Sequence, residues 1–341
     1  MTATRLEEIT ARYPDLCIAV VGDFCLDRYL EIDPARQETS IETGLPVHNV
    51  VKMRAQPGGA GTILNNLSAL GVGSLYPVGS AGQDGEGFEL CRALAAMRSV
   101  RLDHFLQTEE RRTFTYCKPL VMEAGHPPRE LNRLDSKNWT PTPPAVEARI
   151  IQAVTCLTRE VSAFILLSQV DVPETGVVTA GLLKALSPIA TTQPGLLIIA
   201  DSRRGLRGYP PVSFKMNAAE LSALVGTKTQ LSLVEIRKSA AELAKQQGRP
   251  VFITLSERGI VGAAPSGEVE HVPALPVRGE IDIVGAGDAV TANLTAALAA
   301  EATLREALEI ANAAASIVIH QLGTTGTAPV EQIRRLLEST R

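Results

Sequence analysis

One glycine-rich segment, Asp282-Ile283-Val284-Gly285-Ala286-Gly287-Asp288, stands directly before a long stretch rich in Ala and Leu. Two glycines at the start of a helix let backbone N–H groups converge, and the helix N-terminus adds a partial positive charge. Such a site can stabilise the negative charge that builds on a transferred phosphoryl group. Asp288, in the first helical turn, could accept a proton from an attacking hydroxyl group. The alternative is a tight turn in which Asp288 only caps the helix.

Other nucleotide-binding and metal-binding motifs fit the sequence poorly. The segment from Gly285 to Val290 does not complete the dinucleotide fingerprint G-x-G-x-x-G, because Val290 stands where the third glycine belongs. No P-loop pattern G-x-x-x-x-G-K-[ST] occurs. The histidines form no H-E-x-x-H or i,i+4 pair, so we expect no metal site other than one for Mg²⁺. The odd number of cysteines, none in C-x-x-C spacing, argues against a disulfide framework or a structural zinc site. The net charge of −4 without a basic block argues against a nucleic-acid surface.

Short apolar runs alternate with segments of helical periodicity along most of the chain. We expect buried strands at 16–21, 75–78, 163–167, 196–200, 251–254 and 260–263. We expect helices at 5–12, 58–70, 85–97, 145–157, 175–186, 218–225, 233–247, 287–300, 304–321 and 329–338. This alternation predicts an α/β fold in which helices cover both faces of a mostly parallel sheet.

Two polar, β-rich segments, about 31–56 and 101–135, interrupt this alternation. We interpret them as a small sheet, or lid, inserted in a single domain that spans residues 1–335. No apolar run approaches ~18 residues, and the N-terminus has no hydrophobic leader segment, so we expect a cytoplasmic protein.

Four further motifs follow one another along the chain. Gly58-Gly59-Ala60-Gly61 opens a predicted helix that contains Asn66; a glycine-dense loop spans 78–87; Asn217 and Glu220 begin another helix; and a Thr254–Gly259 segment follows a strand. In this order and spacing the set resembles the PfkB (ribokinase-like) family of carbohydrate kinases, over about residues 16–329. The segments 22–29, 131–135 and 311–315 most resemble the heptose-7-phosphate kinase branch, which includes the kinase half of the bifunctional ADP-heptose synthesis enzyme.

The resemblance implies a three-layer α/β/α sandwich with a β lid, ATP and Mg²⁺ as cofactors, and transfer of the ATP γ-phosphate to a sugar hydroxyl. It implies that Asp288 is the catalytic base and that the backbone of Gly285, Ala286 and Gly287 forms the anion hole. The residues implied to hold the nucleotide are Asn217, Glu220, Ser256, Gly259 and Asn312, with Asn217 and Glu220 also placing Mg²⁺ through water. The residues implied to hold the substrate are Asp23, Asp27, Gly58, Gly59, Asn66, Arg133 and Arg203.

Several of these roles have simpler alternatives. Asn217 and Glu220 could form an ordinary helix N-terminus, and Asp27 could be a solvated loop charge. The basic cluster Arg203, Arg204 and Arg207 could be a solvated loop, or it could hold a phosphate on the acceptor.

The sequence also departs from the family pattern. Thr62 stands where an Asn is usual, Ser256 replaces a common glycine, and the segment 168–173 lacks the lysine of the heptose kinases. Ile283 and Val284 offer no side-chain oxygen, so a K⁺ site would rest on Asp282 and backbone carbonyls.

The resemblance implies that the acceptor is a sugar or sugar phosphate, with heptose 7-phosphate as one candidate and an unphosphorylated sugar or nucleoside as another. Outside this class, two other functions stay open: a non-catalytic sugar- or nucleotide-binding protein, and an NAD-dependent oxidoreductase. Lid sheets of this family commonly pair, so the resemblance also implies a homodimer formed through the lid.

Overall fold

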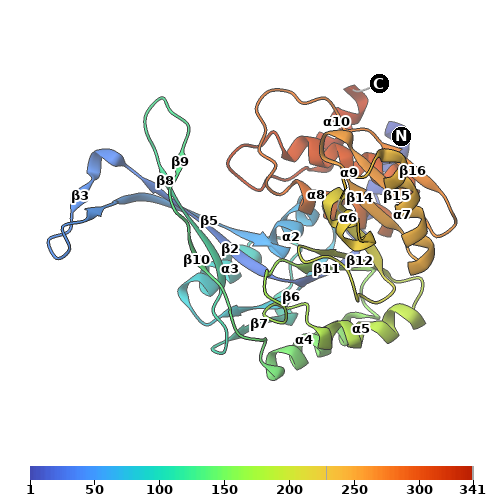
Figure 1. Ribbon diagram of the computed structural model, residues 1–341, viewed down its shortest axis with the longest axis horizontal. Helices are drawn as coiled ribbons and strands as arrows, with labels where there is room; N and C mark the ends of the chain where they lie inside the picture. Colours follow the sequence, from blue (N-terminus) through green and yellow to red (C-terminus); the bar gives the residue numbers. More distant parts are fainter. Residues whose placement is uncertain (228, 340–341) are drawn as a thin grey trace.

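The computed structural model describes residues 1–227 and 229–339, and it contains a three-layer α/β/α body from which a second sheet projects (Figure 1). The strands of the main sheet lie in the order β16 (Val269–Val272), β15 (Ile260–Ala263), β14 (Val251–Thr254), β13 (Ser213–Asn217), β12 (Leu197–Ser202), β11 (Ala163–Ser168), β1 (Cys17–Gly22), β6 (Ser74–Gly82) and β7 (Phe105–Thr108). The strands from β14 to β7 are parallel, and β15 and β16 are antiparallel. The α/β fold class expected from the sequence is confirmed.

The main sheet is apolar on both faces, because helices cover each of them. In β1, Ile18 and Val20 belong to one hydrophobic core, whereas Ala19 and Val21 belong to the other, as the two-residue period of a strand requires. The first core is covered by α1 (Ala3–Thr10), α2 (Ala60–Ala69), α3 (Gly85–Ala95), α8 (Ala286–Ala299), α9 (Leu304–Val318) and α10 (Val330–Ser339). The second core is covered by α4 (Pro144–Leu157), α5 (Ala180–Thr192), α6 (Ala218–Val225) and α7 (Leu233–Gln247).

Helix α8 differs from the others because it is buried around its whole circumference. Its residues from Ala289 to Ala297 are all buried, and small Ala and Thr side chains let α2 and α9 approach it closely. A helix that is buried on every side has little freedom to shift against its neighbours. The packing of α8 therefore fixes the position of Asp288 in its first turn.

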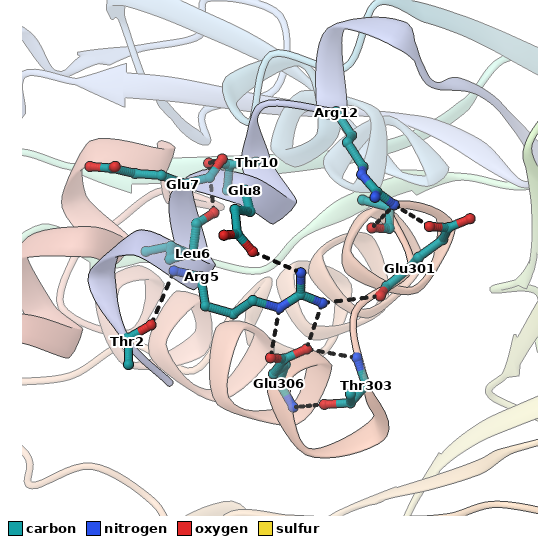
Figure 2. A network of polar contacts seen from close by, with 11 residues as sticks. Thr2, Arg5, Leu6, Glu7, Glu8, Thr10, Arg12, Glu301, Thr303 and Glu306 are labelled. Atoms are coloured by element: carbon teal, nitrogen blue, oxygen red, sulfur yellow. Dashed lines mark hydrogen bonds and ion pairs between the residues drawn. The ribbon is translucent and has the colours of Figure 1, made fainter.

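The C-terminal end of α8 is held by Arg5 of α1 and by Arg12, which follows that helix (Figure 2). Arg12 donates a hydrogen bond to the carbonyl of Ala300 at 3.2 Å and forms an ion pair with Glu301. Arg5 donates to Glu306 at 2.9 Å, and Glu306 forms a capping box with Thr303 at the start of α9. These contacts fix the α8–α9 turn at the end of α8 opposite Asp288.

The second sheet has the strand order β10 (Leu134–Ser136), β8 (Phe114–Val121), β2 (Phe24–Ile32) and β5 (Val50–Gly59), and β9 (Arg129–Glu130) pairs with β8. A separate small pair, β3 (Glu38–Thr39) and β4 (Pro46–Val47), extends its far end (Figure 1). Strand β2 follows β1 after a single residue, Asp23. The short 3-10 helices are η1 (Tyr13–Asp15), η2 (Pro34–Arg36), η3 (Leu102–His104) and η4 (Ser256–Arg258).

The second sheet differs from its expected bounds. It begins earlier, at Phe24, because β2 continues the line of β1 out of the main body. Of the segment expected at about 101–135, only the part from Phe114 onward belongs to the second sheet, because β7 pairs with β6 in the main sheet.

Some elements also differ from the sequence-based expectation. The helix expected to begin at Thr175 begins at Ala180, where Thr179 caps it by accepting a hydrogen bond from the N–H of Leu182. Strand β13 was not expected, because Lys215 interrupts its apolar pattern. Within the described residues, no helix is long and apolar enough to cross a membrane.

Candidate active site

The candidate site lies where the carboxyl ends of β1, β11, β12 and β13 meet the N-terminus of α8. Asp23 follows β1, Asp201 lies near the end of β12, and Asn217 ends β13. Parallel strands deliver their carboxyl ends to the same edge of a sheet, which is where open α/β folds bind ligands. The sheet topology thus gathers residues that lie far apart in the sequence.

Asp288 has the properties of a base that works near neutral pH. Burial and, to a smaller extent, the negative charge of Asp201 raise the pKa of its carboxyl group to about 7, although the ammonium of Lys215 acts in the opposite direction. A carboxylate with this pKa can exchange a proton with a hydroxyl group more readily than an ordinary aspartate. This environment therefore favours proton transfer to Asp288 near neutral pH.

The glycine turn before α8 adopts the conformation that its sequence suggests. Gly285 has a φ of +82°, a left-handed value that a residue with a side chain rarely adopts. A Cβ atom on Gly285 would also lie 3.2 Å from the Cβ atom of Thr325. The first N–H groups of α8, including those of Gly287 and Asp288, have no acceptor within the helix, because helix geometry leaves them free. They can therefore donate to an anion.

A buried network that the sequence analysis missed lies against this turn. Lys215 on β13 donates a hydrogen bond to Asp201 Oδ2 on β12 at 2.7 Å, and Thr291 on α8 donates to the same oxygen at 3.2 Å. A Cβ atom placed on Gly287 would lie 3.2 Å from Lys215 Nζ. The signal in the sequence was a lysine inside the apolar run Phe214–Met216, two residues before Asn217.

Asp27 faces the interior of the site. It is buried, and Lys118 on β8 donates a hydrogen bond to it at 3.1 Å. A Cβ atom on Gly58 would lie 2.4 Å from Asp27 Oδ2, so the glycine makes room for this carboxylate. The alternative that Asp27 is a solvated loop charge is therefore wrong.

Asp23 and its neighbours organise the backbone around the site. The Asp23 carboxylate accepts hydrogen bonds from the N–H groups of Gln169 at 2.7 Å, Val170 at 3.3 Å and Val177 at 2.7 Å. Gly59 has a φ of +58°, and a Cβ atom there would lie 2.5 Å from the carbonyl oxygen of Asp23. Asn66 is fully buried and donates to the carbonyls of Thr62 and Gly326. In this structure, Asp23 and Asn66 therefore hold loops in place.

A groove runs from the start of α6 to η4. It has a volume of about 730 Å³, and its walls include Asn217, Ser222, Leu231, Ser256 and Arg258. This size suits a nucleoside triphosphate, and one end of the groove opens beside the N-terminus of α6.

Asn217 and Glu220 form a reciprocal capping box at that end. The Glu220 N–H donates to Asn217 Oδ1 at 2.9 Å, and the Asn217 N–H donates to Glu220 Oε2 at 2.7 Å. The simpler interpretation as a helix N-terminus is thus realised, and the other Glu220 oxygen stays available for a ligand. Burial raises the pKa of Glu220, and the nearby charge of Asp201 raises it further.

The loop after β14 contains two residues with a positive φ, of which only Ser256 is strained. Ser256 has a φ of +53°, a left-handed value that suits glycine better than serine, and Gly259 has a φ of +89°. A Cβ atom on Gly259 would lie 2.0 Å from the carbonyl oxygen of Val272. Asn312 on α9 donates to the carbonyl of Pro273 at 2.7 Å, which fixes the neighbouring segment.

Positive charges gather between the second sheet and the main body. The Arg133 guanidinium lies 4.6 Å from the centre of the Tyr116 ring, and Lys137 Nζ lies 5.7 Å from the same ring. Arg203 donates to the Tyr116 hydroxyl at 3.5 Å. Asp171 pairs with both Lys137 and Arg203. Of the predicted basic cluster, Arg204 and Arg207 line a different groove, beside Tyr209.

The residues at this site can bind Mg²⁺ only together with phosphate groups of a bound nucleotide. Within residues 1–227 and 229–339, no group of three His, Cys, Asp or Glu side chains could enclose a metal ion. Mg²⁺ commonly binds one or two carboxylates together with substrate phosphates and water. Glu220, with one carboxylate oxygen available beside the groove, meets that requirement.

Comparison with known proteins agrees with this geometry. The model of the pfkB family of carbohydrate kinases matches residues 18–331. The chain belongs to this family. It is 31% identical over 339 residues to the bifunctional protein HldE of Bradyrhizobium sp. (strain ORS 278), which covers 97% of this chain and 65% of that protein. It is 30% identical to HldE of Pelobacter propionicus, over 98% of this chain and 66% of that protein.

This pfkB family chain thus spans somewhat less than two thirds of the length of those relatives. Among solved structures, it matches phosphofructokinase-2 from Escherichia coli in complex with potassium, with a TM-score of 0.70, 21% identity and coverage of 96% and 99% of the two chains. It also matches Arabidopsis thaliana ribokinase complexed with ribose and ATP, with a TM-score of 0.66, 19% identity and coverage of 95% and 99%. These structures share the ribokinase-like fold.

Proposed function

We propose that this chain transfers the γ-phosphate of ATP to a hydroxyl group of a sugar phosphate, with heptose 7-phosphate as the acceptor. The observation that carries the proposal is Asp288, a carboxylate with a pKa of about 7 beside a glycine turn with free N–H groups. The acceptor oxygen attacks the γ-phosphorus, Asp288 takes the hydroxyl proton, and the bond to the ADP oxygen breaks. The N–H groups of the turn stabilise the charge on the transferred group.

The groove at α6 and η4 is the place for ATP. Its end beside Asn217 lies close to the glycine turn, because Lys215, two residues before Asn217 on β13, reaches Gly287 with its Nζ atom. When bound, Mg²⁺ neutralises charge on the phosphates, and Glu220 is placed to hold one of its water ligands.

The segment around Asp282 is the place that we propose for a monovalent cation. The Asp282 carboxylate accepts hydrogen bonds from the N–H groups of Val284 at 3.0 Å and Gly323 at 3.2 Å. We assign K⁺ to this carboxylate and the adjacent backbone carbonyls. Rates measured with K⁺ and with tetramethylammonium test this assignment, and equal rates would contradict it.

The cations between the second sheet and the main body support a phosphorylated acceptor. Arg133, Lys137 and Arg203 lie around Tyr116 and can present several N–H donors to one phosphate. In this proposal the second sheet acts as a lid that excludes water, which would otherwise compete for the phosphoryl group. The lysine that is missing from segment 168–173 is replaced by these side chains.

The second sheet also supports a homodimer. Its edge strand β5 exposes unpaired backbone groups, and Val51, Met53 and Leu134 expose large apolar side chains. We assign a second copy of this chain to that surface. Light scattering of wild type and Met53→Glu tests it, since the substitution should shift the mass toward the monomer. A wild type that is monomeric at micromolar concentration would contradict the assignment.

ADP release over a panel of acceptors tests the proposed activity. We expect heptose 7-phosphate to give a higher kcat/KM than unphosphorylated hexoses, pentoses and nucleosides. Arg203→Ala should lower kcat/KM for the phosphorylated acceptor by about 10–100-fold, the range of a lost charge-assisted contact, and should affect unphosphorylated sugars little. Arg204→Ala is the matched control, because it lies next in sequence but lines another groove. A preference for an unphosphorylated acceptor would contradict the phosphate site but not the kinase activity.

A further inference from the structure

Lys215 is an unusual residue for its position. It lies in the interior of the main sheet with a side-chain exposure of 7%, between the apolar residues Phe214 and Met216. Lysine is almost never buried unless its charge is paired, because removal of an ammonium group from water is costly. The partner is Asp201 on the adjacent parallel strand, at 2.7 Å.

The direction of the Lys215 side chain suggests more than an ion pair. Its Nζ lies where a side chain on Gly287 would begin, since a Cβ atom there would be only 3.2 Å away. Gly287 therefore lets the ammonium approach the backbone of the turn that opens α8. The hydroxyl of Thr291, one helical turn further on, lies within hydrogen-bond distance of the same Asp201 oxygen and of the Gly287 carbonyl, and its single hydrogen is shared between them. The ion pair is thus tied to the helix that carries Asp288.

We infer that Lys215 is a further residue of the phosphoryl-transfer centre: its ammonium, held by Asp201, faces the γ-phosphate at the Gly285–Gly287 turn and stabilises the charge there. The inference rests on the proposed kinase function. A fixed cation next to free N–H groups adds directly to the stabilisation that those groups give to a phosphoryl group, and it needs no rearrangement during the reaction. Asp201 makes the burial of this charge possible and orients it.

The same network affects Asp288. The charged and titratable groups that act on Asp288 are Asp201 and Arg203 from the end of β12, Lys215 from β13, and Asp27 and Cys25 from β2. Lys215 lowers the pKa of Asp288, whereas Asp201 raises it. Removal of Lys215 alone should therefore shift the acid limb of the kcat profile to higher pH, and removal of Asp201 alone should shift it to lower pH.

Binding measurements without an acceptor test the inference directly. Calorimetry with ADP and with the non-hydrolysable analogue AMP-PNP, at saturating Mg²⁺, isolates the γ-phosphate contact. We expect Lys215→Met to weaken AMP-PNP binding by about 10–100-fold, the range of a lost hydrogen bond to a charged group, and to leave ADP binding within about twofold. Lys215→Arg should restore part of the difference. Lys238→Met, on the exposed face of α7, is the matched control.

A double variant separates the phosphate contact from a structural role. Lys215→Met alone leaves the Asp201 charge buried without its cation, which can destabilise the fold, whereas Lys215→Met with Asp201→Asn removes both charges. We expect the double variant to regain stability and a near-normal acid limb, and to keep the loss of AMP-PNP affinity and of kcat.

Two outcomes would overturn the inference. One is equal loss of ADP and AMP-PNP affinity in Lys215→Met, and the other is recovery of wild-type AMP-PNP binding in the double variant. A wild type that binds AMP-PNP more tightly than ADP but phosphorylates no acceptor would contradict only the proposed function.

Discussion

Replacement of Asp288 by Asn tests the centre of the proposed mechanism. Asn keeps the shape of the side chain but cannot accept a proton, so kcat should fall by about 10²–10⁴-fold while ATP affinity changes little. In the wild type, a base with a pKa of about 7 should give kcat an acid limb centred near that pH. About a tenth of the molecules would be active at pH 6 and about nine tenths at pH 8.

The same substitution should also change stability in a pH-dependent way. Folding raises the pKa of Asp288 from 3.8 to about 7, so its favourable contribution is complete below pH 3.8 and is lost as the pH rises through 7. The free energy of unfolding falls by about 4 kcal/mol over this whole pH range, and about 2–3 kcal/mol of that fall occurs between pH 5 and pH 8. Asp288→Asn removes this dependence. Relative to wild type, the variant should therefore be more stable at pH 8 than at pH 5 by that amount.

Two assays check these expectations. Pre-steady-state ADP release isolates the chemical step, and urea unfolding at pH 5 and pH 8 gives the free energies of unfolding. Asp15→Asn, an exposed residue in η1, serves as the control. The reasoning is refuted if Asp288→Asn retains more than about a tenth of the wild-type kcat, or if the acid limb is centred below about pH 5. An identical effect on stability at both pH values would show that the carboxyl group is ionised throughout.

Three further substitutions test other parts of the site. Glu220→Gln should raise the Mg²⁺ concentration for half-maximal rate by about 10-fold or more and leave stability nearly unchanged, since Gln can keep the capping box; an unchanged Mg²⁺ titration would contradict a role in metal binding. Ser256→Gly should raise the free energy of unfolding by up to about 1 kcal/mol, because glycine tolerates the φ of +53°; a lower urea midpoint would contradict this. Lys118→Met should raise the acceptor KM by about 10-fold without a change in the ATP KM, because Lys118 holds Asp27; equal effects on both KM values would indicate a general disturbance.

The parts of the fold that follow local patterns could be predicted from the sequence. The strand at Cys17–Gly22 and the helix at Ala286–Ala299 lie within one or two residues of their expected bounds, because turn residues mark their ends. Strand β13 could not be predicted in the same way, since its apolar pattern contains Lys215. That lysine is compatible with a buried strand only because Asp201 lies beside it on β12, which is a tertiary contact.

The candidate site also has parts that local sequence predicts and parts that depend on tertiary contacts. The glycine turn and Asp288 carry a local signal, because a helix start needs particular residues at particular spacings. The environment of Asp288 carries none, since Asp201, Lys215 and Asp27 come from three other strands. Asp23 shows the opposite case: a resemblance suggested sugar binding, whereas its carboxylate holds three backbone N–H groups.

The junction between the two sheets has a mechanical consequence. The chain crosses from one sheet to the other at Phe24 and Gly59, which are paired with each other, and at Phe114, which pairs with Cys25. Any rotation of the second sheet must pivot about this line. Lys137 follows Ser136, which pairs with Thr115 next to the pivot, so Lys137 would move little. Arg133 precedes Leu134, which pairs with Cys117 further along β8, and would travel further. Opening would therefore separate Arg133, which moves with the second sheet, from Arg203, which follows β12 in the main body, and would divide the group of cations proposed to hold an acceptor phosphate.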